Sequence, residues 1–363
     1  MSARTIVLAA GGTGGHLFPA RALARELSER GHRPILVTDT GGPAAGDESL
    51  PVHHVSAGGV VGKGKLGKAL GAAKLGRGYV QAHRLLRRLA PDTVVGFGGY
   101  GALPTAMAGA HQGRRVVLHE QNAVAGRANR VLARRAHAVV LGFPDPAGLP
   151  HGVPATLTGN PVRGAIARIG AHGYLAPGPD DPVTLLVVGG SQGARAFNEL
   201  IPAAVARLPG ELRGRLRIVQ QVPGEQEDAV RAAHAEAGVA ESEVAAFFTD
   251  MPDRLHAAHL VVARAGASTV TELAAAGRPA VLIPFPHAAD DHQTANAEAA
   301  EAAGAAWLMP EPTLTPAALA ERLGGLLHHP GQLVRAAEHA RVFAVSTSAA
   351  RLADLVTGEE GAR

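Results

Sequence analysis

The glycine-rich turn GGTGGHLFPA at residues 11–20 has the composition of an anion-binding loop. It follows the apolar run Ile6–Ala10 and precedes the helix-like stretch Ala20–Leu27. Such a turn exposes backbone N–H groups to ligand oxygens, and the dipole of the following helix favours negative charge. A second turn, GGSQGAR at 189–195, adds the hydroxyl of Ser191. Both turns predict binding of a phosphate or pyrophosphate.

Titratable and polar side chains accompany the first turn. His16 closes it, and imidazole titrates in the range that a general base requires. The segment LHEQNAVAG (118–126) sets His119, Glu120, Gln121 and Asn122 directly after an apolar run. Four polar groups at a strand end are costly to bury without partners, which predicts the rim of a binding site.

Further polar residues in the second half suit a sugar nucleotide. Glu272, expected in the first turn or so of a helix, either accepts hydrogen bonds from vicinal ribose hydroxyls or complements the helix dipole. In PHAADDHQTANA, Asp291, His292 and Gln293 either recognise sugar hydroxyls or begin a solvated helix. Arg163, in GNPVRG, offers a guanidinium beside a proline-rich hinge.

The sequence lacks common metal and dinucleotide signatures. It has no Asp-x-Asp, no His-Glu-x-x-His and no cysteine, so no metal site is expected, and helix N-termini would stabilise a leaving diphosphate. The first turn misses the third glycine of a dinucleotide fingerprint. The segments GKGKLG (62–67) and GFGGYG (96–101) match it formally, which leaves an oxidoreductase as an alternative.

Alternation of strands and helices positions these residues and predicts the α/β class. Continuously apolar strands separated by alanine-rich helical stretches are typical of parallel sheets covered on both faces. The apolar runs are TIVLAA (5–10), PILVT (34–38), DTVVGF (92–97), RVVLHE (115–120), AVVLGF (138–143), VTLLVVGG (183–190), RIVQQ (217–221), LVVARAG (260–266) and AVLIPF (280–285).

The two halves of the chain follow one plan. Residues 5–15 resemble 184–194, and VVGFGGYGALPTAMAGA (94–110) parallels VVARAGASTVTELAAAG (261–277). The proline-rich stretch 142–164 between them is typical of a hinge. We expect a domain at 1–160, a second at 161–340, and a helix from Val342 to Val356, within 341–363, that returns to the first domain. Ligands of parallel sheets bind beyond the carboxyl ends of the strands, so two facing sheets would hold two substrates across a cleft.

The composition indicates how many domains the chain forms, where the protein is located and which charged surfaces it has. A chain of 363 residues with 46% hydrophobic residues suits two domains. The absence of cysteine, of a secretory segment and of a long apolar window leads us to expect a cytoplasmic protein. The net charge is +4, and all four lysines fall within residues 63–74 of an amphipathic stretch, 63–88, that also holds four arginines. That stretch is either a solvated helix face or a surface for anionic lipid; a nucleic-acid site is less favoured, because only one aromatic accompanies it.

Six motifs together resemble the MurG family of bacterial cell-wall glycosyltransferases: GGTGGHLFPA, GGYGALP, HEQNAVAGRAN, GNPVR, GGSQGAR and ARAGASTVTELAAAGRPAVLIPFP. The resemblance implies two Rossmann-like domains (the GT-B fold) and transfer of N-acetylglucosamine from UDP-GlcNAc to the muramoyl C4 hydroxyl of undecaprenyl-linked lipid I, giving lipid II. It implies an inverting reaction without cofactor or bound catalytic metal. It also implies peripheral attachment of residues 63–88 to the anionic cytoplasmic face of the membrane, with no nucleic acid as partner.

The resemblance also assigns residues. It implies that UDP-GlcNAc contacts Thr13, Gly14, Gly15, Asn122, Arg163, Ser191, Phe248, Ala267, Ser268, Thr269, Val270, Thr271, Glu272 and Gln293. It implies that the acceptor contacts Gly98, Gly99, Tyr100 and His119. His16 is the expected catalytic base, with Glu120 as the runner-up.

Two sets of alternatives remain. PFPHAADDHQTANA is a residue longer than in some relatives, so either His292 or Gln293 contacts the sugar, and Gln293 is favoured. A UDP-sugar epimerase shares the bilobal plan and the donor side, and a non-catalytic sugar-binding protein shares the two lobes. The epimerase would not need a lipid-facing basic stretch.

Overall fold

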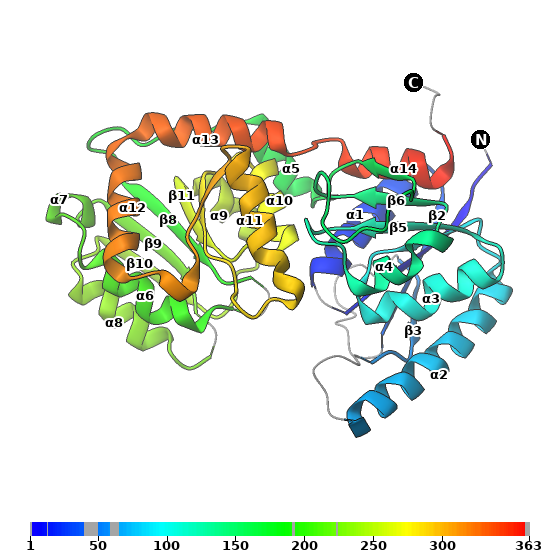
Figure 1. Cartoon of the computed structure of the whole chain (residues 1–363). Helices are drawn as coiled ribbons and strands as arrows, with labels where there is room; N and C mark the ends of the chain where they lie inside the picture. The colour runs from blue at the N-terminus through cyan, green and yellow to red at the C-terminus, as the bar shows by residue number, and fades with distance from the viewer. Residues whose placement is uncertain are drawn as a thin grey trace. The chain divides into compact units, whose positions relative to one another are not determined.

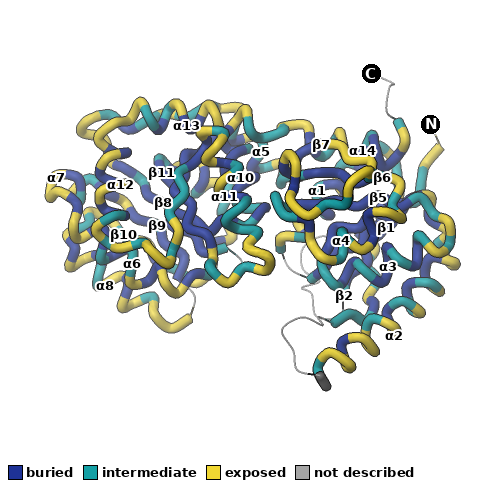
Figure 2. Tube along the Cα trace, in the orientation of Figure 1, coloured by how far each residue is buried: buried dark blue, intermediate teal, exposed yellow. Residues whose placement is uncertain are grey.

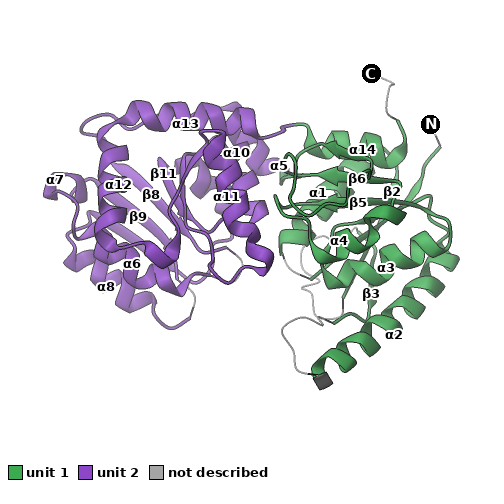
Figure 3. Cartoon of the chain, viewed as in Figure 1, with its two compact units in different colours: residues 1–163, 347–363 green, residues 164–346 purple. Residues whose placement is uncertain are grey.

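A computed structural model describes residues 2–12, 14–39, 50–58, 65–190, 193–222 and 224–359. The chain divides into two compact units (Figure 3). Unit 1 comprises residues 1–163 and 347–363, and unit 2 comprises 164–346. These divisions lie a few residues further along the chain than those expected from the sequence.

Unit 1 is built on a seven-stranded parallel sheet (Figure 1). The strand order is β3-β2-β1-β4-β5-β6-β7, so β1, β4 and β5 are neighbours. The strands are β1 (Thr5–Ala10), β2 (Arg33–Asp39), β3 (Val52–Val55), β4 (Thr93–Gly96), β5 (Arg115–Glu120), β6 (Ala138–Leu141) and β7 (Ala155–Leu157).

Helices cover both faces of this sheet. They are α1 (Gly14–Glu29), α2 (Lys65–Leu89), α3 (Gly99–His111), α4 (Arg127–Leu132), the 3-10 helix η1 (Ala133–Arg135) and α14 (Ser348–Thr357). Ile6 and Leu8 of β1 pack in one apolar cluster with α1 and α14, whereas Val7 packs in another with α2 and α3. Successive residues of a strand point to opposite faces, which is why the unbroken apolar run of β1 serves both cores. Figure 2 shows the buried strands beneath the helices.

Unit 2 repeats the plan with six parallel strands in the order β10-β9-β8-β11-β12-β13. The strands are β8 (Val183–Val188), β9 (Leu216–Gln221), β10 (Glu241–Ala245), β11 (Leu260–Ala263), β12 (Ala280–Leu282) and β13 (Ala306–Leu308). The helices are α5 (Gly164–Ala171), α6 (Arg195–Val205), α7 (Gly210–Arg213), α8 (Glu227–Glu236), α9 (Met251–Ala257), α10 (Ala267–Ala275), α11 (His292–Ala302), α12 (Pro316–His328) and α13 (Pro330–Phe343), with 3-10 helices η2 (Ala289–Asp291) and η3 (Glu311–Thr313).

The two sheets confirm the predicted α/β class and the internal similarity. β1 and β8 each lie third in their strand orders, and each is followed by the strand of the second similar segment, β4 or β11. The similar glycine turns therefore occupy equivalent strand ends in the two units.

Other expectations were right in part. The helix expected from Val342 to Val356 is interrupted, since α13 ends at Phe343 and α14 begins at Ser348, but α14 belongs to unit 1 as predicted. The stretch 142–164 includes the division between the units after Arg163 and also contains the edge strand β7. The apolar-run criterion also missed the short outer strands β3, β10 and β13, which are partly polar or very short.

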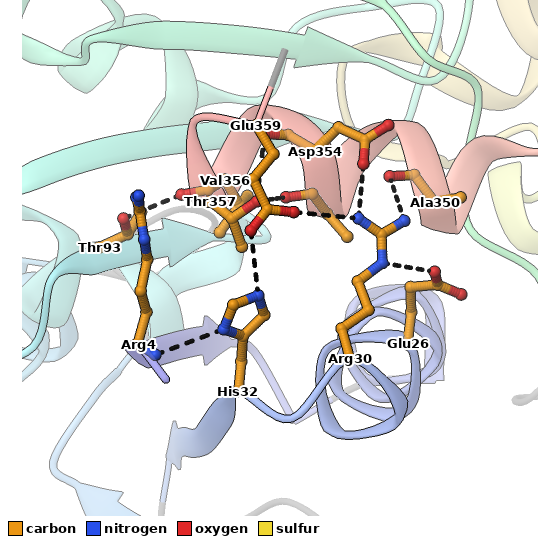
Figure 4. Close-up of polar contacts among 11 residues, drawn as sticks. Arg4, Glu26, Arg30, His32, Thr93, Ala350, Asp354, Val356, Thr357 and Glu359 are labelled. Atoms are coloured by element: carbon orange, nitrogen blue, oxygen red, sulfur yellow. Dashed lines mark hydrogen bonds and ion pairs between the residues drawn. The ribbon is translucent and has the colours of Figure 1, made fainter. Parts of the chain in front are cut away.

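Helix α14 is fastened to unit 1 by polar contacts that Figure 4 shows. Arg30 at the end of α1 forms an ion pair with Asp354 at 2.5 Å and donates to the carbonyl of Ala350 at 3.2 Å. Thr93 donates to the carbonyl of Val356 at 3.0 Å. Helix α14 is thereby joined to the end of α1 and to β4.

Candidate active site

In unit 1, three neighbouring strands end at the predicted polar residues. β1 leads to His16 in the first turn of α1, β4 leads to Gly98 and Gly99 at the start of α3, and β5 ends at Glu120. Because the strands are parallel, their carboxyl ends share one edge of the sheet, where ligands of such folds bind.

The ring of His16 packs against Gly11 and Gly99. A Cβ atom added at Gly99 would lie 3.0 Å from both Cδ2 and Nε2 of His16, and one at Gly11 would lie 3.2 Å from Cδ2. Gly98 and Gly99 also have φ angles of 76° and 73°, a region that side chains disfavour. The GGYG turn therefore needs glycine both for its backbone and for room beside the imidazole.

Gln121 is the residue that holds this imidazole. Its side chain is 2% exposed, and its Nε2 donates to the carbonyl of Phe97 and lies 3.2 Å from Nδ1 of His16. The sequence placed Gln121 on the rim without a role of its own. The only sequence signal was its position between Glu120 and Asn122.

Glu120 is 1% exposed and is engaged by its own loop. Its Oε1 accepts from the backbone N–H of Asn122 at 3.1 Å. Its Oε2 accepts from the backbone N–H of Gly126 and from Nδ2 of Asn129, both at 2.8 Å. The carboxylate thus shapes the turn between β5 and α4.

His119 is fully buried and packs against Phe97, with ring centroids 5.2 Å apart. Burial lowers the pKa of His119 to about 4, a shift opposed by the Gly159 backbone and reinforced by His16. Its side chain therefore lies beneath the strand end as a neutral ring. The expectation that it forms part of the exposed rim was wrong, because β5 directs this side chain into the core.

The other predicted residues of unit 1 lie around the same edge. Gly14 and Gly15 open α1, Tyr100 is half-buried in the first turn of α3, and Asn122 is half-buried after β5. The guanidinium of Arg163 lies 5.2 Å from the ring centroid of Phe18. Thr13 lies outside the described residues.

In unit 2 the corresponding edge is formed by β8, β11 and β12. Arg264, directly after β11, is 6% exposed and donates to the carbonyls of Ile283 and Pro284, both at 3.1 Å. It also pairs with Glu311 at 2.5 Å. This buried cation, which was not among the predicted site residues, ties two strand ends together before α10.

Gln293 of α11 supports the same loop. Its Oε1 accepts from the backbone N–H of Ala265 at 3.2 Å and from that of Phe285 at 2.9 Å. Because the oxygen is occupied in this way, the amide nitrogen is the group left to donate. His292 is half-buried, and its Nδ1 contacts the carbonyl of Ala289 at 2.7 Å within the same turn.

The predicted helix 267–272 is the start of α10. Ser268 and Thr269 are half-buried, whereas Ala267, Val270 and Thr271 are buried. Thr271 donates to the carbonyl of Ala267 at 2.7 Å. Glu272 is half-buried, and it is the sixth residue of the helix, early in the second turn and close to its predicted place in the first turn or so.

The remaining predicted residue of unit 2 that the structure describes is Phe248. It is 5% exposed, and the guanidinium of Arg254 lies 4.0 Å from its ring centroid. Such stacking fixes the ring, so a ligand would meet this position through the backbone. Ser191 lies outside the described residues.

Two broader properties of the described residues bear on substrates. They contain no group of three or more histidine, aspartate or glutamate side chains arranged to hold a metal ion. In the part of the chain that the structure describes, no helix combines the length and apolarity needed to cross a bilayer.

Both units of the chain match domains of one glycosyltransferase family. Residues 6–141 match the glycosyltransferase family 28 N-terminal domain, and residues 184–355 match the C-terminal domain of that family. The two strand-edge sites thus lie in the two halves of a family 28 glycosyltransferase.

Full-length relatives narrow this class. The chain is 53% identical to the UDP-N-acetylglucosamine--N-acetylmuramyl-(pentapeptide) pyrophosphoryl-undecaprenol N-acetylglucosamine transferase of Rhodospirillum centenum, covering 99% of this chain and 96% of that protein. It is 51% identical to the enzyme of the same name from Rhodospirillum rubrum, covering 97% and 91%. The chain therefore belongs to this transferase family, as the sequence motifs predicted.

Solved structures agree on the fold. Acinetobacter baumannii MurG superposes with a TM-score of 0.79 at 33% identity, covering 98% of this chain and 99% of that one. The calicheamicin glycosyltransferase CalG4 and a putative UDP-N-acetylglucosamine 2-epimerase from Listeria monocytogenes reach TM-scores of 0.67 and 0.70 at 20% and 14% identity. Since transferases and epimerases share this GT-B fold, the fold alone does not separate them, whereas the full-length identity does.

Proposed function

We propose that this protein transfers N-acetylglucosamine from UDP-GlcNAc to the muramoyl C4 hydroxyl of undecaprenyl-linked lipid I, forming lipid II for peptidoglycan synthesis. The observation that carries the proposal is 53% identity over 99% of the chain to a transferase of that name. The acceptor oxygen attacks the anomeric carbon, the bond from that carbon to the UDP oxygen breaks, and the configuration inverts. The hydroxyl proton passes to solvent water in the same step.

Unit 2 would bind most of the donor. Backbone N–H groups at the starts of α6 and α10 would receive the diphosphate, in place of a divalent ion. Glu272 would accept from the ribose hydroxyls, and Gln293 would donate to the sugar through its amide nitrogen. Ser191, Phe248 and Ala267–Thr271 would complete this site.

Unit 1 would bind the acceptor. The start of α3 places Gly99 and Tyr100 near His16, and Gly98 directly precedes this helix. The N-termini of α1 and α3 both favour the pyrophosphate of lipid I. Of the two side chains predicted for catalysis, Glu120 is buried and accepts hydrogen bonds from its own loop and from α4, so we assign the acceptor contact to His16.

Helix α2 would dock on the membrane that carries lipid I, at its cytoplasmic face. Spacings of three, four and seven residues place Leu70, Lys74, Arg77, Arg84 and Arg88 on one stripe of the helix, and all five are exposed. The neighbouring face is buried: a Cβ at Gly78 would overlap the carbonyl of Ser56. Exposed cations beside exposed Leu70 and Val80 suit anionic headgroups.

The test supplies the purified protein with UDP-GlcNAc and a lipid I analogue in the presence of EDTA. We expect a disaccharide product and one UDP per transfer. Release of a free UDP-sugar isomer would instead support an epimerase, and an increase in NADH fluorescence on titration would support an oxidoreductase. His16→Leu should abolish transfer, while His329→Leu, which alters an exposed histidine in unit 2, should leave it unchanged.

A further inference from the structure

The side-chain amide of Gln121 makes two contacts that only one orientation satisfies. The same atom, Nε2, faces the carbonyl oxygen of Phe97 and Nδ1 of His16. A carbonyl oxygen accepts and never donates, so the atom facing Phe97 must be the NH2 nitrogen. Rotating the amide by half a turn would set two oxygens against each other in a site that is 2% exposed.

This orientation fixes the proton on the imidazole. An amide nitrogen carries two hydrogens and accepts none, so its contact with His16 requires a lone pair on Nδ1. The neutral ring then carries its proton on Nε2. The hydrogen bond at one ring nitrogen thus decides the tautomer and the chemistry available at the other.

We propose that Gln121 is a positioning residue that holds His16 as an Nε2–H hydrogen-bond donor to an oxygen of the acceptor pyrophosphate, and that His16 is therefore not the general base. The inference rests on the proposed function and deepens it. It corrects the sequence-based expectation that His16 removes the hydroxyl proton.

The surroundings of Nε2 agree with donation to an anion. This nitrogen lies beside Gly99, where α3 begins, and His16 itself lies in the first turn of α1. Both helix N-termini favour negative charge at this edge. For His16 to act as a base through Nε2, the proton would have to move to Nδ1, and Gln121 would have to rotate and lose its bond to Phe97.

The tautomer can be observed directly. Nitrogen NMR of protein labelled with ¹⁵N-histidine, at a pH where His16 is neutral, distinguishes a protonated ring nitrogen from one with a lone pair. We expect Nδ1 of His16 to carry the lone pair and Nε2 the proton. The opposite assignment would overturn the proposal regardless of whether the protein transfers any sugar, which separates its failure from that of the proposed function.

Substitutions at His16 separate a donor from a base. Glutamine supplies an amide N–H near the position of Nε2 but cannot take up a proton at neutral pH. We expect His16→Gln to retain kcat within about tenfold, and His16→Leu to lose a further hundredfold or so, as for removal of one donor to a developing charge. Equal losses in the two variants would contradict the donor role.

A second pair of variants tests Gln121 itself. In Gln121→Glu an oxygen replaces the NH2 group, so the hydrogen bond to the carbonyl of Phe97 is lost and the carboxylate accepts from Nδ1–H of His16. The neutral ring then presents a lone pair at Nε2, and the donor exists only on the imidazolium. The activity of this variant should therefore fall as pH rises through the pKa of His16, whereas the wild type should show no such fall. The matched control is Gln112→Glu. Gln112 follows the far end of α3, and its side-chain amide donates to the carbonyl of His83 on α2.

Apart from the carboxyl group introduced at position 121, the ionisable groups near His16 are the same in Gln121→Glu and in the wild type. They are His119, whose pKa His16 lowers, its neighbour Glu120 on β5, Asp39 at the end of β2, and Tyr100, which follows Gly99 on α3. A descending limb that appears only in Gln121→Glu therefore reports the changed partner of Nδ1. Identical pH profiles in the variant and the wild type would overturn the proposal.

Discussion

Arg30 and Asp354 form an ion pair at 2.5 Å although they lie 324 residues apart in the chain. Their side chains are 14% and 30% exposed, and Glu26 and Glu359 approach the same guanidinium (Figure 4). Burial lowers the pKa of Arg30, but hydrogen bonds to Asp354 and Glu26 and the charges of these two carboxylates together outweigh it, so the pKa is raised and the group stays charged.

Removing this cation should loosen α14. We expect Arg30→Ala to lower the Tm of unit 1 by about 2–6 °C, because a partly buried charged network of this kind contributes roughly 1–2 kcal/mol. Arg25→Ala is the control from the same helix, since its pair with Glu29 is 68% and 59% exposed, and it should leave the Tm unchanged. Scanning calorimetry measures both; equal shifts would show that α14 is held by apolar contacts alone.

We expect Glu120 to stabilise the turn between β5 and α4 and not to act as a general base. Glu120→Gln replaces an acceptor oxygen by an NH2 group facing an N–H donor, and should lower both the Tm and kcat. Asn129→Ala removes one partner of the carboxylate and leaves the carboxylate in place. We expect losses of kcat within about threefold of each other in these two variants. A large loss confined to Glu120→Gln, together with loss of the ascending limb of the pH profile, would instead identify Glu120 as the base.

Gln293 and His292 should differ sharply in donor binding. Gln293→Leu removes the acceptor of two backbone N–H groups and the amide donor, and should raise KM for UDP-GlcNAc by at least about tenfold. His292→Ala removes a contact within its own turn and should change KM by less than about threefold. Initial rates at saturating acceptor decide between them, and the reverse order would assign the sugar contact to His292.

Stability should decline in mild acid because two histidines are buried as neutral rings. Burial lowers the pKa of both His119 and His234 to about 4. Below pH 6.5 the two histidines bind protons in the unfolded chain but not in the folded protein. Each therefore lowers the free energy of unfolding by about 1.4 kcal/mol per pH unit until pH 4. His234→Asn, which can keep the hydrogen bond to Ser242, should reduce the fall in Tm between pH 7 and 5 by about half. An unchanged slope would mean that other groups govern acid stability.

The stripe on α2 should determine binding to anionic vesicles. Reversing Lys74, Arg77 and Arg84 to glutamate should weaken partitioning onto phosphatidylglycerol vesicles roughly a hundredfold or more, since each cation contributes about 1 kcal/mol. The same reversal of Arg207, Arg322 and Arg335, which are exposed on unit 2, should have a much smaller effect. Vesicle co-sedimentation at low and high salt measures this; equal losses in both triple variants would indicate a response to net charge only.

The central strands were predictable because their signal is local. A strand that is covered on both faces must be apolar at every position, and β1, β5 and β8 show this in sequence. Edge strands lack that constraint: all three residues of β7 are exposed, and β10 is largely polar. An edge strand forms by pairing with the adjacent strand of the sheet, and the local sequence does not indicate which strand that is.

The glycine turns and the polar segment after β5 were likewise visible in the sequence, because anion binding requires particular residue types in adjacent positions. What each polar side chain does was decided by strand order, since β1-β4-β5 brings residues about a hundred positions apart to one edge. No local pattern indicated that Gln121 would face His16 rather than solvent, or that His119 would be buried beneath the strand end. Hydrogen-bond direction and burial are set by contacts between distant segments, so only the tertiary structure could show which of these polar side chains contact one another and which are buried.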